Sequence, residues 1–168
     1  MQLVDIDKNT YRSHLNMVIV AAVAVFSALG VGISALLVFW FGTVQGQNFY
    51  LNLLGVSIGG AIAAWCLHRL KTTRYFYEVA YVWDLKQELN LINRKLAVLK
   101  KAVEAQDTDA MTVMLYHLQG SKQLWQLDDN ILNLQELELE LIQLEHKIRG
   151  SGLLLDPNQY QRSMLDKF

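Results

Sequence analysis

Two long stretches of the chain consist of apolar and uncharged residues. The first, 17–41, reads MVIVAAVAVFSALGVGISALLVFWF and contains 25 residues; the second covers 49–67. No Asp, Glu, Lys or Arg occurs between His14 and His68, whereas the rest of the chain carries all 31 charged residues. Because about 20 apolar residues in a helix cross the hydrocarbon layer, the pattern predicts two transmembrane helices joined by a short loop, 42–48.

After the second stretch, apolar residues recur at alternating intervals of three and four. This spacing predicts the seam of a coiled coil. Neither Gly nor Pro occurs between Ala61 and Gln119, so we expect the second span to continue without a break into this helix. The predicted seam consists of Val82, Leu85, Leu89, Ile92, Leu96, Leu99 and Val103.

Polar residues at 106–109 interrupt the seam, and Asp107 or Thr108 is the expected N-cap of a returning helix over 109–149. The alternating run Leu137–Leu141 is predicted to be helical because its Leu and Glu residues favour helices. Gly120 could mark a break. A second apolar stripe on this helix predicts a face for a partner, made by Trp125, Leu132 and Leu139, with Met114 on the same stripe.

The expected fold is therefore all-α: a two-span transmembrane helical hairpin that continues into an antiparallel cytoplasmic coiled-coil hairpin. An N-terminal segment, 1–16, precedes the spans, the helical domain covers 68–149, and a tail covers 150–168. The run Leu153–Leu155 in that tail predicts contact with the membrane surface, with disorder as the alternative.

Basic residues lie just outside both spans, and the connecting loop has none. Since such residues stay on the cytoplasmic side, we expect both termini in the cytoplasm. A cleaved signal peptide is the alternative interpretation of the first span, but its apolar region is too long and acidic residues precede it. The flanking basic residues are Lys8, Arg12, Arg69, Lys71 and Arg74.

The two halves of the helical domain have opposite charge. Five basic residues against one acidic residue lie in 86–101, and nine acidic residues against one basic residue lie in 104–145. An antiparallel hairpin folded at residue 107 would bring opposite charges together, which selects the register more than it stabilises the fold. The expected pairs are Lys86 with Asp128, Arg74 with Glu140, and Arg69 with Glu145.

Small residues occur at helical spacing in both spans. Such residues let helix backbones approach closely in lipid, either within the hairpin or between protomers. Ser34 and Asn52 could add hydrogen bonds between helices. The predicted packing residues are Ala28, Gly32, Gly55, Gly59, Gly60 and Ala64.

No pattern typical of catalysis, cofactor binding or metal binding occurs. The single cysteine, Cys66, lies in the second span, and the four histidines do not have the spacing that places metal ligands on one helical face. A net charge of -1 gives no global reason to expect nucleic acid binding, which normally needs a basic face. We therefore expect a protein that is not an enzyme and uses no cofactor.

The N-terminal phrase Leu3-Val4-Asp5-Ile6-Asp7-Lys8, followed by Tyr11–Asn16 and a two-span hairpin, resembles a family of short proteobacterial membrane proteins known only as a domain of unknown function. The resemblance extends over nearly the whole chain. It implies a bacterial inner-membrane location and supplies no site residues.

The sequence thus favours a membrane-anchored interaction or scaffold protein. Its expected partners are membrane lipid and either further copies of itself or an unidentified protein that docks on the coiled coil, with no nucleic acid. The alternative is an oligomeric two-span channel or pore subunit, in which Asn52, Ser57 and Gly60 would face a lumen.

Overall fold

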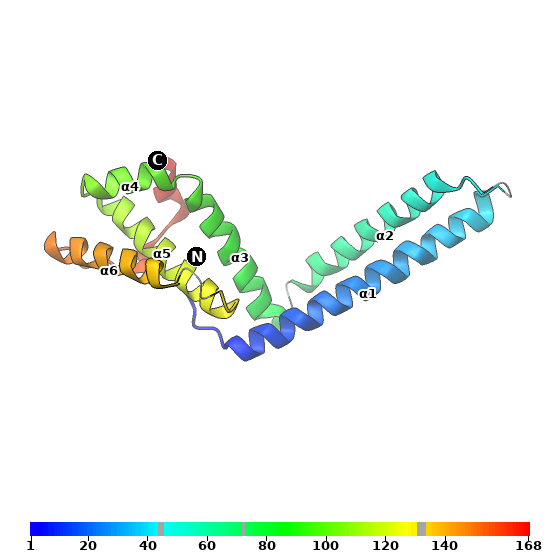
Figure 1. Cartoon of the computed structure of the whole chain (residues 1–168), viewed down its shortest axis with the longest axis horizontal. Coiled ribbons are helices and arrows are strands. Elements are labelled where there is room, and N and C mark those ends of the chain that lie inside the picture. The colour runs from blue at the N-terminus through cyan, green and yellow to red at the C-terminus, as the bar shows by residue number, and fades with distance from the viewer. Residues whose placement is uncertain (44–45, 72, 131–133) are drawn as a thin grey trace. The chain divides into compact units, whose positions relative to one another are not determined.

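The computed structural model describes residues 1–43, 46–71, 73–130 and 134–168. It divides into two compact units, one formed by residues 9–80 and the other by residues 1–8 together with 81–168. Helices make up both units, and no strand occurs among the residues that the structure describes (Figure 1). The predicted all-α fold, with two long apolar helices followed by helical hairpins, is confirmed.

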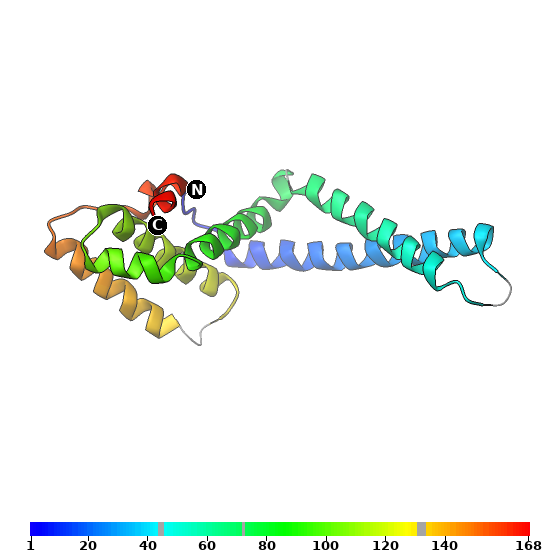
Figure 2. The same cartoon turned by 90° about the horizontal axis from the view of Figure 1, so that it is seen from above.

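The first unit contains α1, Lys8–Phe41, and α2, Phe49–Leu70, which run side by side (Figures 1 and 2). Both are long and apolar enough to cross a membrane. The first helix begins nine residues before the predicted span, at Lys8, and Tyr11 within this extension is buried. The predicted N-terminal segment 1–16 is thus divided: its second half is already part of α1.

Two glycines of α2 bring the helices into contact. Gly55 and Gly59 are buried, and the two residues opposite them on α1, Ser34 and Gly30, are buried as well. A Cβ at Gly59 would lie 2.8 Å from the backbone nitrogen of Gly30, which leaves no room for any side chain. The Ser34 hydroxyl donates a hydrogen bond to the backbone oxygen of Asn52 at 3.0 Å. Close backbone approach and one interhelical hydrogen bond therefore hold the hairpin.

The other predicted packing residues lie elsewhere. Gly60 faces the ring of Phe26, while Ala28, Gly32 and Ala64 are exposed on the outer surface of the hairpin. Of the two alternatives, packing within the hairpin thus applies to Gly55, Gly59 and Gly60, while packing between protomers stays a prediction for the other three residues. The sequence shows that small residues are present but does not show which side of each helix faces its partner.

The expected continuous helix from the second span into the domain is wrong. The α2 helix ends at Leu70, a 3-10 turn, η1, covers Arg74–Phe76, and α3 begins at Tyr77. The backbone N–H groups of Thr73 and Phe76 bond three residues back, to Leu70 and Thr73. β-Branched and aromatic residues gather here, and their weaker helix propensity permits the break without Gly or Pro.

The end of the hairpin nearest this break is held by polar and aromatic contacts. His14 Nδ1 lies 3.0 Å from Glu78 Oε2, and its ring lies 4.3 Å from that of Tyr75. The Tyr75 hydroxyl also donates to Met17 Sδ at 3.3 Å. These contacts attach the start of α1 to the chain that follows α2.

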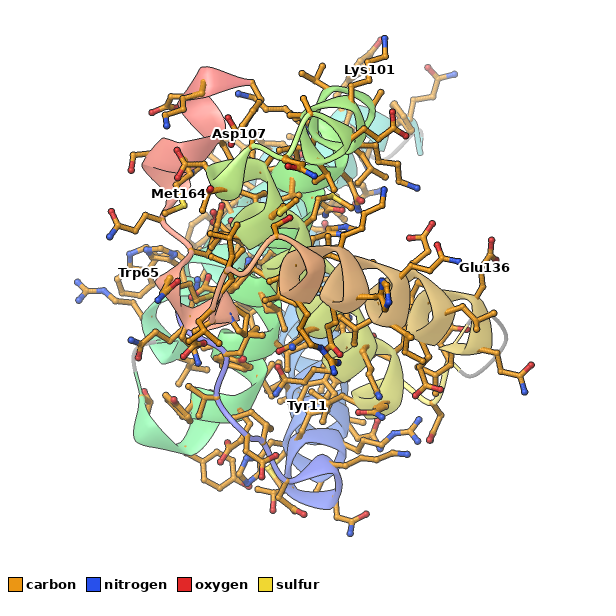
Figure 3. The ribbon with its side chains drawn as sticks, turned by 90° about the vertical axis from the view of Figure 1, so that its left-hand side faces the viewer. Tyr11, Trp65, Lys101, Asp107, Glu136 and Met164 are labelled. Carbon is orange, nitrogen blue, oxygen red and sulfur yellow. The ribbon has the colours of Figure 1, made fainter. Side chains whose placement is uncertain are left out.

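The second unit is the helical domain, built around one central helix. Its helices are α3, Tyr77–Asn93; α4, Leu96–Glu104; α5, Thr108–Leu127; and α6, Leu134–Gly150. Two 3-10 helices follow, η2, Pro157–Gln159, and η3, Arg162–Lys167. Every residue from Ala110 to Leu118 of α5 is buried, because α4, α6 and the C-terminal segment pack around it (Figure 3).

The predicted seam residues do form apolar core. Six of the seven are buried, and Leu96 is half-buried. They do not lie on one helix, however, since α3 ends at Asn93 and α4 starts at Leu96. The Asn93 side chain bonds to His117 of α5 at 2.8 Å, and the Lys95 ammonium donates to the backbone oxygen of Leu165 at 2.6 Å. At the break between α3 and α4, the polar side chains thus bond to distant parts of the chain.

The expected single returning helix is two helices. Asp107 is the N-cap of α5, as predicted, and its carboxylate accepts from the backbone N–H of Ala110 at 2.9 Å. The helix then ends at Leu127, where Asp129 adopts a left-handed conformation, φ 56°, and the N–H of Asn130 bonds back to Trp125 at 2.9 Å. This arrangement is a Schellman cap.

The observed ion pairs follow the shorter helices. Lys86 and Asp128 form the predicted pair at 2.9 Å. Glu140 binds Lys100, and Glu145 binds Arg149; the side chain of Arg74, the expected partner of Glu140, lies outside the described residues. The long antiparallel register therefore holds only near Asp128, and the predicted run Leu137–Leu141 is confirmed as helical within α6.

Gly120 does not break a helix. It lies inside α5 and is buried, and a Cβ there would meet the side chains of Leu89 at 3.1 Å and Leu85 at 3.3 Å. The glycine lets α3 approach α5 closely. Its role is packing between helices.

The C-terminal tail is ordered on the helical domain. Tyr160 and Leu165 are buried, and the Tyr160 ring stacks on Tyr116 with centroids 4.3 Å apart. The Tyr160 hydroxyl donates to Glu88 at 2.6 Å. Disorder, the alternative for this segment, is thus not observed, while Leu154 of the Leu run projects outward with 95% of its surface exposed.

Candidate functional site

The outer face of α6 carries two exposed large apolar side chains. On its inner face, Leu137, Leu144 and Ile148 are buried. On the opposite face, Leu139 and Ile142 are 60% and 61% exposed. Exposed apolar residues that lie together on a helix are typical of a protein contact. We call this surface the α6 outer face; it consists of Leu139 and Ile142, with Gln135 and His146 one turn beyond at either end.

Two ion pairs connect α6 to α4 and α5 beside this face. Glu138 binds Lys122 of α5 at 2.9 Å, and Glu140 binds Lys100 of α4 at 3.1 Å. Each exposed pair contributes only about 0 to 1 kcal/mol. Their main effect is to neutralise the acidic residues beside the apolar pair. Glu136, at the first turn of α6, points away from the domain (Figure 3).

A small groove lies between α4, α5 and α6. Its volume is about 170 Å³. Charged residues line its rim and apolar residues its floor, and two of the rim charges, Lys100 and Glu140, pair with each other. The groove can therefore hold only a small molecule. Its lining includes Lys100, Glu140, Lys147, Met114, Leu118 and Leu144.

A buried polar group lies next to that groove. His117 is 7% exposed, and its Nε2 lies 2.8 Å from Asn93 Oδ1, while its Nδ1 is buried with no partner among the described residues. Burial lowers the pKa of His117 to about 4, although the nearby Glu140 acts in the opposite direction. The imidazole is consequently neutral at pH 7.

Because His117 is buried and neutral, we expect the helical domain to lose stability in acid. Unfolded His117 binds a proton near pH 6.5, whereas the folded domain resists protonation until about pH 4. The free energy of unfolding should therefore fall as the pH drops through this interval, by about 2 kcal/mol between pH 7.5 and 5. Chemical denaturation followed by circular dichroism measures the loss.

A matched pair of variants tests whether His117 causes this pH dependence of stability. His117→Gln should lose most of this pH dependence, while His146→Gln, at an exposed position of α6, should retain it. Equal pH dependence in the two variants would contradict the assignment to His117.

Two tyrosines attach the tail to α5. Tyr116 is fully buried, and its hydroxyl has no partner among the described residues. Burial raises the pKa of both Tyr116 and Tyr160 above the ordinary range, with Glu88 contributing at both. These hydroxyls remain protonated at physiological pH, so Tyr160 can donate to Glu88. The two tyrosines therefore pack the C-terminal tail against α5.

The predicted partner face is only partly brought together. Leu139 is exposed on α6, Trp125 is half-buried on α5, and Leu132 lies outside the described residues. Met114 is buried in the core. One stripe cannot contain them all because α5 and α6 are separate helices. Ile142 was not predicted to belong to this face, although its spacing of three residues from Leu139 places both side chains on the same side of a helix.

Among the described residues, no group of three or more His, Cys, Asp or Glu side chains is arranged to hold a metal ion. The features that remain are an exposed apolar face, a small groove and buried polar contacts.

A model of a protein family of unknown function, DUF3087, matches residues 1–165. The chain belongs to this family. The resemblance inferred from the N-terminal phrase and the two-span layout is thereby confirmed at the level of the family. Comparison with curated proteins and with solved structures found no significant match.

Proposed function

We propose that this protein is a membrane-anchored interaction protein of the bacterial inner membrane. In this proposal, α1 and α2 cross the bilayer and the helical domain lies in the cytoplasm. The charge-free apolar stretches and the length of both helices support the anchor. The basic residues outside both spans, against none in the loop, support the orientation.

The two-unit organisation agrees with such a topology. Residues 1–8, which precede α1, pack in one unit with residues 81–168, which follow α2. Both parts must then lie on the same side of the membrane, as an even number of spans requires. The N-terminus and the helical domain would share the cytoplasm.

The observation that carries the interaction role is the α6 outer face. Leu139 and Ile142 are exposed although the inner face of the same helix is buried. The spacing of Gln135, Leu139, Ile142 and His146 is four, three and four residues. This order is the same in both directions, so antiparallel pairing with a second copy sets Leu139 opposite Ile142 twice, as a two-fold interface needs. We therefore propose a second copy of the chain as the occupant.

Replacing the apolar pair should separate the copies. The double variant Leu139→Asp with Ile142→Asp places charges at the centre of the proposed contact, and we expect roughly 30-fold weaker dimerisation. Mass measurement of the protein in nanodiscs or mild detergent gives the stoichiometry. Gln126→Asp, at an exposed position of α5, is the control that should remain dimeric.

Two outcomes would contradict this proposal. One is a dimer that survives the double substitution. The other is a wild-type protein that is strictly monomeric; recovery of a different protein by crosslinking in the membrane would then assign the face to that partner.

An oligomeric channel is the second candidate, favoured by one observation. Asn52 and Ser57 are exposed on the hairpin and are not buried between α1 and α2, although the Ser57 hydroxyl already donates to the backbone oxygen of Leu53 at 2.8 Å. Copies arranged around a pore could turn these side chains inward. Absence of ion or solute flux in reconstituted bilayers would rule this candidate out.

A further inference from the structure

The first residues of the chain bind the helical domain in an extended conformation. The backbone N–H of Val4 donates to the Tyr81 hydroxyl at 2.9 Å, and the Val4 carbonyl accepts from Gln123 Nε2 at 2.5 Å. The Tyr81 hydroxyl in turn donates to Gln123 Oε1 at 3.0 Å. Two side chains, one from α3 and one from α5, thus satisfy both backbone groups of a single residue and also bond to each other.

Further contacts on either side extend this recognition. The N–H of Leu3 donates to Asn158 Oδ1 of η2 at 2.8 Å, and the Leu3 side chain lies close to Gly120. Ile6 is 8% exposed. Lys8 forms an ion pair with Asp129 just after α5. Apolar side chains at positions 3 and 6 face the domain, while Asp5 and Asp7 are exposed.

These contacts resemble the binding of a peptide more than the packing of a helix. Residues 2–6 lie outside every helix, and each partner named above is at least 77 positions away in sequence. The order of this segment therefore depends on the domain. Main-chain hydrogen bonds supply affinity, and the apolar side chains supply selectivity, as in other complexes with extended peptides.

We propose that α3, α5 and η2 form a binding site for an extended peptide with apolar residues three positions apart, and that the N-terminal segment is its tethered ligand. This role goes beyond the proposed self-association, which uses α6. We call this tethered segment, residues 1–8, the latch.

Tethering explains how so short a segment stays bound to the domain. A short connection gives an effective concentration in the millimolar range, so even a weak peptide ligand remains bound in cis. We expect the same peptide, when it is separate, to bind with a Kd of roughly 0.1 to 1 mM.

The test uses the full chain in nanodiscs with residues 2–7 deleted. A fluorescent peptide of sequence MQLVDIDK is added, and its anisotropy is followed. Saturable binding to the deletion variant is the expected result, with about two- to tenfold weaker binding to the intact chain because its own latch competes.

Two peptide variants test the geometry without altering the protein. Val4→Pro removes the N–H that donates to Tyr81 and should weaken binding by about three- to tenfold. Val4→Ala keeps both backbone groups and should bind nearly as the parent does. Failure of the parent peptide to bind a folded deletion variant, or equal binding of the two Val4 variants, would overturn the proposal.

If the deletion variant does not fold, hydrogen exchange in the intact chain takes its place. The full chain with Val4→Pro should then expose residues 1–8 while α5 remains protected, and the chain with Val4→Ala should not. Equal protection of residues 1–8 in both chains would likewise overturn the latch.

Discussion

Ile92→Asp should unfold the helical domain while leaving the membrane hairpin inserted. The Ile92 side chain is completely buried in α3, and a carboxylate there loses its hydration without gaining a partner. The substitution also removes apolar contacts, so we expect the domain to lose about 4 kcal/mol of its free energy of unfolding. Chemical denaturation followed by circular dichroism measures the loss, and alkaline extraction of membranes shows that the hairpin remains inserted.

Val98→Asp is the matched control for this substitution. Val98 lies on α4 with 49% of its surface exposed, so a charge there keeps its water. Its stability should change by less than about 0.5 kcal/mol. A stable Ile92→Asp domain would mean that the residues of the predicted seam do not form the core.

Gly59→Ala should open the hairpin. The added Cβ would lie 2.8 and 2.9 Å from the backbone nitrogen and Cα of Gly30. Backbone atoms cannot rotate away as a side-chain end can, so the two helices have to separate. We expect a cost of about 3 kcal/mol, at the upper end for an overpacked contact. Unfolding in mixed micelles of mild detergent and dodecyl sulfate measures it.

Gly32→Ala supplies the comparison within the same hairpin. No atom lies within 4 Å of a Cβ placed at Gly32, and alanine favours helix over glycine. The variant should therefore be as stable as the wild type or slightly more stable. If both alanine variants behaved alike, the close contact between Gly59 and Gly30 would not hold the hairpin.

The sequence was most informative where one physical effect dominates. Charges are excluded from 15–67, and that exclusion predicts the two apolar helices directly. The Asp107 cap was likewise predictable, since a carboxylate before a helical pattern accepts an N-terminal N–H. Lys86 and Asp128 pair as the charge pattern predicted.

The helix breaks were not predictable from Gly and Pro alone. Asn93, the last residue of α3, bonds to His117, and Lys95, just before α4, bonds to the backbone of Leu165; both partners are remote in sequence. The end of α5 does have a local signal, since Asp128-Asp129-Asn130 supplies residues that tolerate the left-handed conformation of Asp129. Reading that run as a cap would have separated α5 from α6.

The candidate site was predictable only in part, for the same reason. A stripe drawn through Trp125 and Leu139 assumes one helix, and the break between α5 and α6 removes that assumption. The binding of the N-terminal latch to the domain could not be predicted, because so short an extended segment has no repeating pattern of apolar residues. Its partners, Tyr81 and Gln123, are identified only by the tertiary fold.

The proposed anchor and its orientation can be tested together by labelling single cysteines with a membrane-impermeant reagent. In a Cys66→Ser background, cysteines are placed at Gln2, Gln47 and Leu154, all of which are exposed. Vesicles of both orientations are labelled. The proposal predicts that positions 2 and 154 react only from the cytoplasmic face and position 47 only from the opposite face. Labelling of all three positions from one face, or of positions 2 and 154 from different faces, would contradict it.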